Sequence, residues 1–146
     1  MPMYSIAGRS TVAGTSARAI ASLFGIASHG GWLREVGVFN TTSTAVAVSL
    51  NRFTNATNVG AGLTEVQWNE EGAAPSITGF AGHTGDSSAL GSAIRQASLG
   101  AAVGSGVIWT FTGQGLRIAP GTANGLGIIC PTGTGQILDY YFDWDE

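Results

Sequence analysis

An alternation of aromatic and acidic residues at positions 137–144 constrains the fold of this chain most. The segment reads Ile-Leu-Asp-Tyr-Tyr-Phe-Asp-Trp and is followed by Asp145 and Glu146. One parity is apolar: Leu138, Tyr140, Phe142 and Trp144. The other parity carries Asp139, Tyr141, Asp143 and Asp145. Successive side chains of a strand point to opposite faces, so this pattern predicts a half-buried strand with its aromatics on a core and its acids toward water.

The rest of the chain consists of short apolar runs separated by Gly, Thr, Ser, Asn and Pro, and its 23 glycines fit many tight turns. Together with the final strand, the runs predict about eight strands. The other seven are Trp32–Phe39, Thr44–Phe53, Leu63–Trp68, Ser76–Phe80, Val107–Thr112, Leu116–Ala119 and Leu126–Cys130. Two further segments, Ser16–Phe24 and Ala89–Ser98, fit either a strand or a short helical turn.

The alternation within these segments also predicts which side chains are buried. Val46, Val48 and Leu50 share one inward parity, and Val36 and Val38 share the parity of Trp32. Val66 and Trp68 are expected to point inward, with Glu65 and Gln67 outward. Most of the four tryptophans (Trp32, Trp68, Trp109 and Trp144) are therefore expected in the core rather than on a sugar-binding platform.

Many short strands at regular spacing are typical of a β-sandwich or barrel. The length of 146 residues fits one domain, and no alternation of strands with helices predicts a parallel sheet. The sequence therefore predicts an all-β fold: a single-domain, antiparallel, jelly-roll-like β-sandwich that spans residues 1–146.

Charge is scarce in this chain. Only 10% of the residues are charged, the six basic residues are all arginine, and the formal net charge is −3. Solubility usually draws on a mixed charged surface. Either other subunits cover much of the surface, which we take as the simpler explanation, or Ser, Thr, Asn and Gly coat it.

The same composition argues against several classes of partner. No run of basic residues could neutralise phosphates, so no nucleic-acid partner is expected. No apolar run reaches the roughly 20 residues of a membrane helix, and Met1–Arg9 lacks the features of a signal peptide. Cys130 is single, so it has no intrachain disulfide partner. We expect a soluble protein that is made in a cytoplasm.

The segment His83–Ser88 contains the residue types of a hydrolytic cluster, because His83 is followed by Asp86 and Ser87. A catalytic triad is assembled from distant segments rather than from neighbours in one loop, so the sequence favours a solvated polar loop. His29 lies in a separate loop, and two histidines apart from each other do not predict a metal site.

The acidic residues give no stronger indication of chemistry. Asp139 and Asp143 share a face but lie roughly 13 Å apart along a strand, too far for a catalytic carboxylate pair. Glu70 and Glu71 read as a solvated loop pair, and the Asn40 and Asn55 sequons as accidental. The glycines match no phosphate-binding motif. The sequence therefore assigns no catalytic, cofactor-binding or metal-binding residue and predicts a protein that is not an enzyme.

Several stretches resemble small virion proteins encoded among the head genes of tailed bacteriophages. They are Leu33–Thr42, Ala45–Arg52, Gly106–Phe111, Gly125–Ile128 and Phe142–Glu146. The resemblance implies a jelly-roll-like sandwich that decorates or cements a capsid, often as a trimer. It carries over no site residue, cofactor or metal.

The expected function is therefore that of a non-enzymatic virion structural protein. It would bind the major capsid protein and copies of itself, bridge capsid subunits and reside on the capsid surface after synthesis in the host cytoplasm. The alternative is a trimeric receptor- or carbohydrate-binding head domain of a phage tail or fibre. Exposed aromatic side chains flanked by Asn and Asp would favour this alternative.

Overall fold

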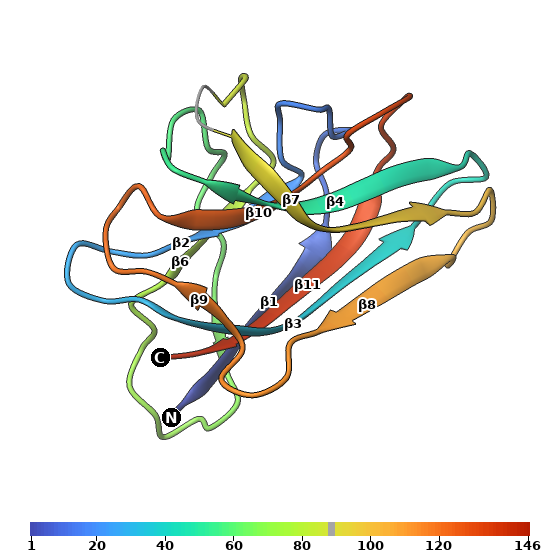
Figure 1. Ribbon diagram of the computed structural model, residues 1–146. Coiled ribbons are helices and arrows are strands. Elements are labelled where there is room, and N and C mark those ends of the chain that lie inside the picture. Colours follow the sequence, from blue (N-terminus) through green and yellow to red (C-terminus); the bar gives the residue numbers. More distant parts are fainter. Residues whose placement is uncertain (88–89) are drawn as a thin grey trace.

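The structure is a computed structural model that describes residues 1–87 and 90–146. It is all-β, with 48% of the residues in strands and no helix in the described ranges. Two antiparallel sheets pack against each other as the layers of a sandwich (Figure 1). The predicted fold class, an antiparallel β-sandwich, is thus confirmed.

Each sheet is named here by its strands in spatial order. Sheet A contains β5 (Val66–Gln67), β1 (Met3–Arg9), β11 (Leu138–Asp145), β3 (Gly31–Asn40) and β8 (Gly106–Thr110), with β9 (Leu116–Ile118) also paired to β3. Sheet B contains β6 (Thr78–Ala81), β2 (Ala21–Phe24), β10 (Gly125–Ile129), β4 (Val46–Phe53) and β7 (Leu90–Leu99).

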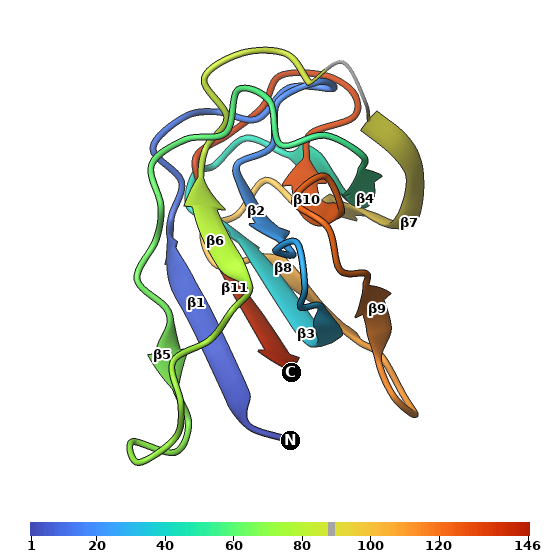
Figure 2. The ribbon, with the colours of Figure 1, turned by 90° about the vertical axis from the view of Figure 1, so that its left-hand side faces the viewer.

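The strand pairing is nested along the chain. β1 pairs with β11, β2 with β10, β3 with β8 and β4 with β7, as in one long hairpin that has rolled up into two sheets. The resulting orders, β1-β11-β3-β8 and β2-β10-β4-β7, are those of an eight-stranded jelly roll. The described residues form eleven strands, more than the eight predicted. The predicted eight include the short strands β5, β6 and β9, which are additional to this core, and do not include its strands β1, β2 and β7. Figure 2 shows β5 beside β1 and β6 beside β2.

Most sequence-predicted segments are found as strands. Six of them correspond to β3, β4, β6, β8, β9 and β10, with ends that differ by a few residues. The two ambiguous segments contain strands: β2 lies within Ser16–Phe24, and β7 covers the described part of Ala89–Ser98. Ser88 and Ala89, the ends of two predicted segments, lie outside the described residues. β1 was not predicted from the sequence.

The final strand is the central strand of sheet A, between β1 and β3. Its apolar parity is buried, as predicted: Leu138, Tyr140, Phe142 and Trp144 are each at most 4% exposed. These side chains pack with residues of both sheets in the main core. The alternation in the sequence therefore identified the strand around which the sandwich is built.

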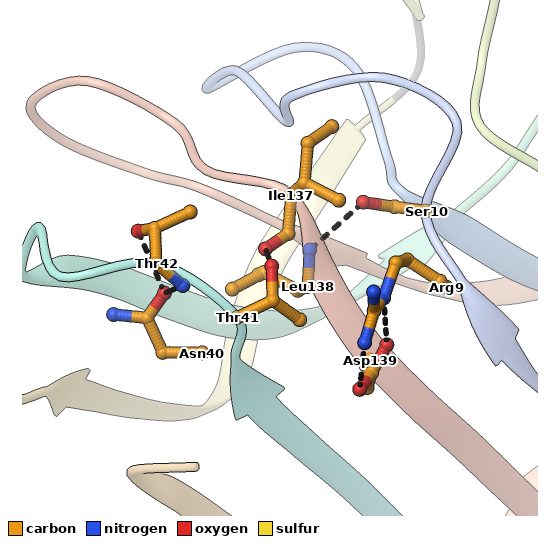
Figure 3. Close-up of polar contacts among 8 residues, drawn as sticks. All are labelled: Arg9, Ser10, Asn40, Thr41, Thr42, Ile137, Leu138 and Asp139. Carbon is orange, nitrogen blue, oxygen red and sulfur yellow. Dashed lines mark hydrogen bonds and ion pairs between the residues drawn. The ribbon is translucent and has the colours of Figure 1, made fainter. Parts of the chain in front are cut away.

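Hydrogen bonds from both neighbouring segments determine where β11 begins (Figure 3). On one side, the Leu138 amide donates to Ser10 Oγ at 2.9 Å. On the other, Thr41 Oγ1 donates to the Ile137 carbonyl at 2.5 Å. Each hydroxyl satisfies a backbone group at the point where the strand enters the sheet, so the register of β11 is fixed at its start.

Two burial predictions are wrong for identifiable reasons. Val66 and Trp68 are each 61% exposed, because β5 is a two-residue strand at the edge of sheet A and not a strand over the core. Trp32 is only partly buried, and Leu33 takes the inward position in its place. The cause is one extra residue, Arg34, which shifts the parity of β3 before Val36.

The central strands of sheet B, β2 and β10, are covered on both faces, whereas its edge strand β7 and the outer face of sheet A are exposed. Besides the main core there is a second cluster of buried apolar side chains, formed by Ala19, Phe24, Phe53 and Ile129, with Val59, Phe80 and Leu90 packed against it. All residues of β2 and β10 are consequently buried. A strand without a polar face reads as a continuous apolar run, as Leu126–Cys130 does in the sequence. The outer face of sheet A is therefore a sheet surface available to a ligand or partner.

Candidate functional site

The open face of sheet A carries a polar row across four strands. Ser5 is paired with Asp143, Asp143 with Glu35, and Glu35 with Thr110. Residues that are directly paired in an antiparallel sheet project to the same face, so the four side chains are neighbours. This row brings two carboxylates together from strands that are distant in the sequence.

A β-bulge adds an arginine to this row. The register between β11 and β3 shifts after Asp143, so that Trp144 pairs with Leu33 and Arg34 is the extra residue. In a bulge two residues oppose one, and the bulge redirects a side chain. Arg34 and Glu35, adjacent in the sequence, both line the same pocket.

This pocket has a volume of about 380 Å³ and lies at the end of sheet A where β11 finishes. Its walls come from β1, β3, β8 and β11 and from the segments that follow β5 and β8. The lining residues are Met3, Arg34, Glu35, Trp68, Thr110, Phe111, Asp143 and Asp145. Three carboxylates, one guanidinium and two aromatic rings therefore meet around one opening.

Glu35 is held in place by two hydroxyl donors. Tyr141 Oη donates to its Oε1 at 2.6 Å, and Thr110 Oγ1 donates to its Oε2 at 2.9 Å. The Tyr141 ring lies over Gly37, where any Cβ would stand 2.0 Å from a ring carbon. Burial, followed by the Glu35 carboxylate, raises the pKa of Tyr141, so its hydroxyl remains a donor. Both oxygens of Glu35 are thus used within the protein.

Trp68 stands at the rim of the pocket and is fixed by a short hydrogen-bond chain. Its indole Nε1 donates to Ser5 Oγ at 2.6 Å, and Ser5 Oγ donates to Asp143 Oδ1 at 2.5 Å. Burial and the nearby Glu35 raise the pKa of Asp143, although the bond from Ser5 opposes the shift. The 61% exposed ring of Trp68 is therefore an aromatic surface of fixed orientation beside a carboxylate.

Asp145 is buried, so the prediction that it faces water is wrong. It is 3% exposed, and Arg34 Nε donates to its Oδ2 at 2.6 Å while Nη2 donates to the same oxygen. Arg34 Nη1 also donates to the carbonyl of Gly113 at 2.7 Å. The bulge turns Arg34 onto the outer face, where it pairs with the carboxylate. Asp145 Oδ1, by contrast, accepts no hydrogen bond from the described residues.

The segment around His83 is a loop, as predicted from the sequence, but it is solvated only in part. His83 is 1% exposed and Ser87 is 8% exposed, and His83 Nε2 lies 3.0 Å from the Oγ of the fully buried Ser22. The His83 ring packs on Phe53 at 5.2 Å between centroids, in the second core. Asp86 instead lies on the surface, in an ion pair with Arg18.

The hydrogen bond between Ser22 and His83 is like that of a catalytic nucleophile and its base. The other parts of a catalytic site, however, are not found around this pair in the described ranges. His83 Nδ1 has no hydrogen-bond partner among the described residues, so no acid orients the ring. Both side chains are also closed off from solvent. The pair is therefore best explained as a polar contact within the second core.

Acidification should destabilise the fold through His83. Burial lowers the pKa of His83, so the unfolded chain binds a proton more readily than the folded protein. We expect the free energy of unfolding to fall as the pH decreases below about 6.5, by at most ~1.4 kcal/mol per pH unit. Urea denaturation between pH 5 and 7.5 measures this slope. His83→Gln should flatten it and the exposed His29→Gln should not; equal slopes in both variants would contradict the assignment.

The other acids considered from the sequence lie apart from the pocket. Asp139 is paired with Arg9 on the exposed part of β11, and Arg9 lowers the pKa of this carboxyl group through their hydrogen bond (Figure 3). Glu146 accepts hydrogen bonds from the amides of Ser76 and Ile77 at 2.8–3.0 Å. Within the described ranges, no three His, Cys, Asp or Glu side chains are placed to hold a metal ion.

The remaining candidates divide between core and surface. Trp144 and Trp109 are buried, Trp32 is partly buried and Trp68 is exposed. Cys130 is a free, buried thiol whose pKa is raised by burial. Residues 1–87 and 90–146 contain no helix that is long and apolar enough to cross a membrane.

The chain was compared with protein-family models, with curated proteins and with solved structures, and none of them matches it.

Proposed function

We propose that this protein is a non-enzymatic virion structural protein that decorates or cements the capsid of a tailed bacteriophage. In this role it binds the major capsid protein, bridges neighbouring capsid subunits and associates as a homotrimer on the capsid surface. Its contribution is mechanical: a rigid sandwich adds buried surface across joints that must resist the pressure of packaged DNA.

The observation that carries the proposal is the asymmetry of the two sheets. The second core covers the outer side of sheet B over β2 and β10, and the edge strand β7 is largely exposed there, whereas the outer face of sheet A is open across several strands. A row of weakly polar residues crosses this face: Ala7, Tyr141, Gly37 and Ile108 are paired in succession. Ile108 is 53% exposed. This weakly polar row lies between the Arg9–Asp139 pair and the polar row of Ser5, Asp143, Glu35 and Thr110. A weakly polar centre with polar groups at its sides suits a protein interface.

The low charge of the chain supports the same role. Desolvating charges at an interface is costly, and only 10% of the residues are charged. A standard protein interface buries about 1,600 Å² in total. The open face of a sandwich of this size can contribute part of that area. Many copies on one shell add avidity, so modest single contacts can stabilise the whole particle.

Removing the protein from its particle tests the proposal. Capsids without it should assemble, because it adds to a finished shell, but they should release DNA at lower temperature or in the presence of a chelator. The measurement compares DNA release on heating and adsorption to cells for deletion and complemented particles. Unchanged heat resistance together with failed adsorption would overturn the cement role.

A second candidate is the receptor- or carbohydrate-binding head domain of a phage tail or fibre. One observation favours it: Trp68 presents an exposed aromatic ring next to Asp143 at the rim of a pocket. Aromatic rings beside hydrogen-bonding groups are typical of sites that take small polar ligands. The adsorption measurement on the same deletion particles distinguishes this candidate from the first.

A further inference from the structure

We propose that the pocket on sheet A is a binding site for an organic cation, an alkylammonium or guanidinium group. This proposal does not depend on the proposed virion function, because it concerns only the residues that line the pocket. The group could belong to a lysine or arginine side chain of a partner protein or to a free polyamine. Both carry a positively charged N–H donor. This group complements the three features of the pocket: negative charge, an acceptor without a donor and an aromatic face.

Charge is the first argument for a cation. Three carboxylates, Glu35, Asp143 and Asp145, line the pocket together with a single guanidinium, that of Arg34. The lining thus carries a formal charge of −2 when all four groups are ionised. Burial, and after it the Glu35 charge, raises the pKa of Asp143. Glu35 and Asp143 are paired across β3 and β11, so the two carboxylates repel each other. A bound cation would relieve this repulsion, whereas a neutral sugar would not.

Asp145 supplies a second and independent argument. It lines the pocket, is 97% buried, and uses only Oδ2 in its pair with Arg34. A buried carboxylate oxygen without a donor costs free energy. Among the described residues none donates to Oδ1. A positively charged donor that enters from the pocket would provide the missing hydrogen bond.

The exposed ring of Trp68 is the third element of the site. A cation over the face of an indole is attracted by the ring's quadrupole, and tryptophan is the strongest aromatic partner. This protein already uses the same contact twice: Arg117 lies 4.8 Å from the centroid of Trp32, and Arg95 lies 5.3 Å from that of Phe111. Trp68 has no such cation among the described residues.

The test uses the full chain with ¹⁵N-labelled tryptophan and follows the Trp68 indole signal by NMR, assigned by its loss in Trp68→Phe. The probes are n-butylammonium and n-butylguanidinium, with n-butanol and a methyl glucoside as neutral counterparts. We expect saturable shifts with both cations, weakened by added salt, and none with the neutral probes. The affinities of a lysine-containing pentapeptide and of putrescine are then compared. Tighter binding of the peptide indicates a protein partner, and tighter binding of putrescine indicates a free polyamine.

A matched pair of variants locates the cation. Asp143→Asn keeps an oxygen that can accept from Ser5 and should weaken cation binding about fivefold or more. Asp139→Asn removes the same charge from the same strand, outside the pocket, and should leave affinity within about twofold. Thermal melting confirms that both variants fold. Equal responses to butanol and butylammonium, saturation by the glucoside alone, no response to any probe, or wild-type affinity in Asp143→Asn would each overturn the proposal.

Discussion

Trp144→Ala should lower the free energy of unfolding by about 3–5 kcal/mol, the usual cost of deleting a large buried aromatic side chain. Trp144 is completely buried in the central strand of sheet A, and its ring centroid lies 5.9 Å from that of Tyr4 on β1. Its indole N–H also donates to Glu146 Oε1 at 3.1 Å. The substitution therefore leaves a cavity and removes a donor from a carboxylate that anchors the amides of Ser76 and Ile77.

Urea denaturation followed by circular dichroism measures this loss, and thermal melting should show a decrease of about 10–20 °C. Trp68→Ala is the matched control, because it deletes the same side chain from an edge position that is 61% exposed. Its cost should stay within about 1 kcal/mol. Equal losses in the two variants would contradict the assignment of Trp144 to the core that holds the two sheets together.

Phe53→Ala should also cost about 3–5 kcal/mol, although Phe53 belongs to the second core and not to the main one. Phe53 is 1% exposed, and its ring lies 6.2 Å from that of Phe24 and 5.2 Å from that of His83. It also fills the space over Gly127, where a Cβ would come within 2.7 Å of the ring. The loss should appear in a single cooperative transition if the second core folds together with the sandwich.

Phe39→Ala provides the comparison on the open face of sheet A. Phe39 is partly buried and stacks on Tyr141 at 6.4 Å between centroids, so its loss should cost about 1 kcal/mol. Unfolding curves from fluorescence and from circular dichroism should coincide for both variants. A Phe53→Ala protein of wild-type stability would mean that the second core is a cover rather than part of the cooperative fold.

The sequence predicts this fold well wherever one face of a strand is buried and the other is not. β11 is recognised because burial alternates with partial exposure along most of it, and that alternation is visible as a period of two. β4 has the same period in its sequence, although Ser49 and Asn51 are buried too. β7 was ambiguous because its small residues, such as Ala93 and Ala97, fit a helix as well as a strand. β1 was missed because its sequence, Met-Tyr-Ser-Ile-Ala-Gly-Arg, carries only two strongly buried side chains, Tyr4 and Ile6.

The pocket was less accessible to prediction, because its parts meet only through strand pairing. Asp143 and Asp145 stand out in the sequence, but nothing in the sequence pairs them with Glu35 or places Trp68 beside them. The bulge at Arg34 depends on register, which a single sequence does not specify. One signal was available: an Arg-Glu pair in the middle of a strand, where charges on both parities suggest an irregularity.

The nested pairing of the strands imposes an order of events on protein synthesis. Ser5 and Asp143, which share a hydrogen bond, are separated by 138 positions, so a ribosome adding 5–20 residues per second makes the second on the order of ten seconds after the first. Throughout this interval β1 exists without the neighbour that later covers one of its edges. An unpaired edge is a template for other chains. On one messenger RNA, β1 of one nascent chain can therefore pair with a strand of a neighbouring nascent chain. Chaperones that bind the early strands should raise the yield of folded protein.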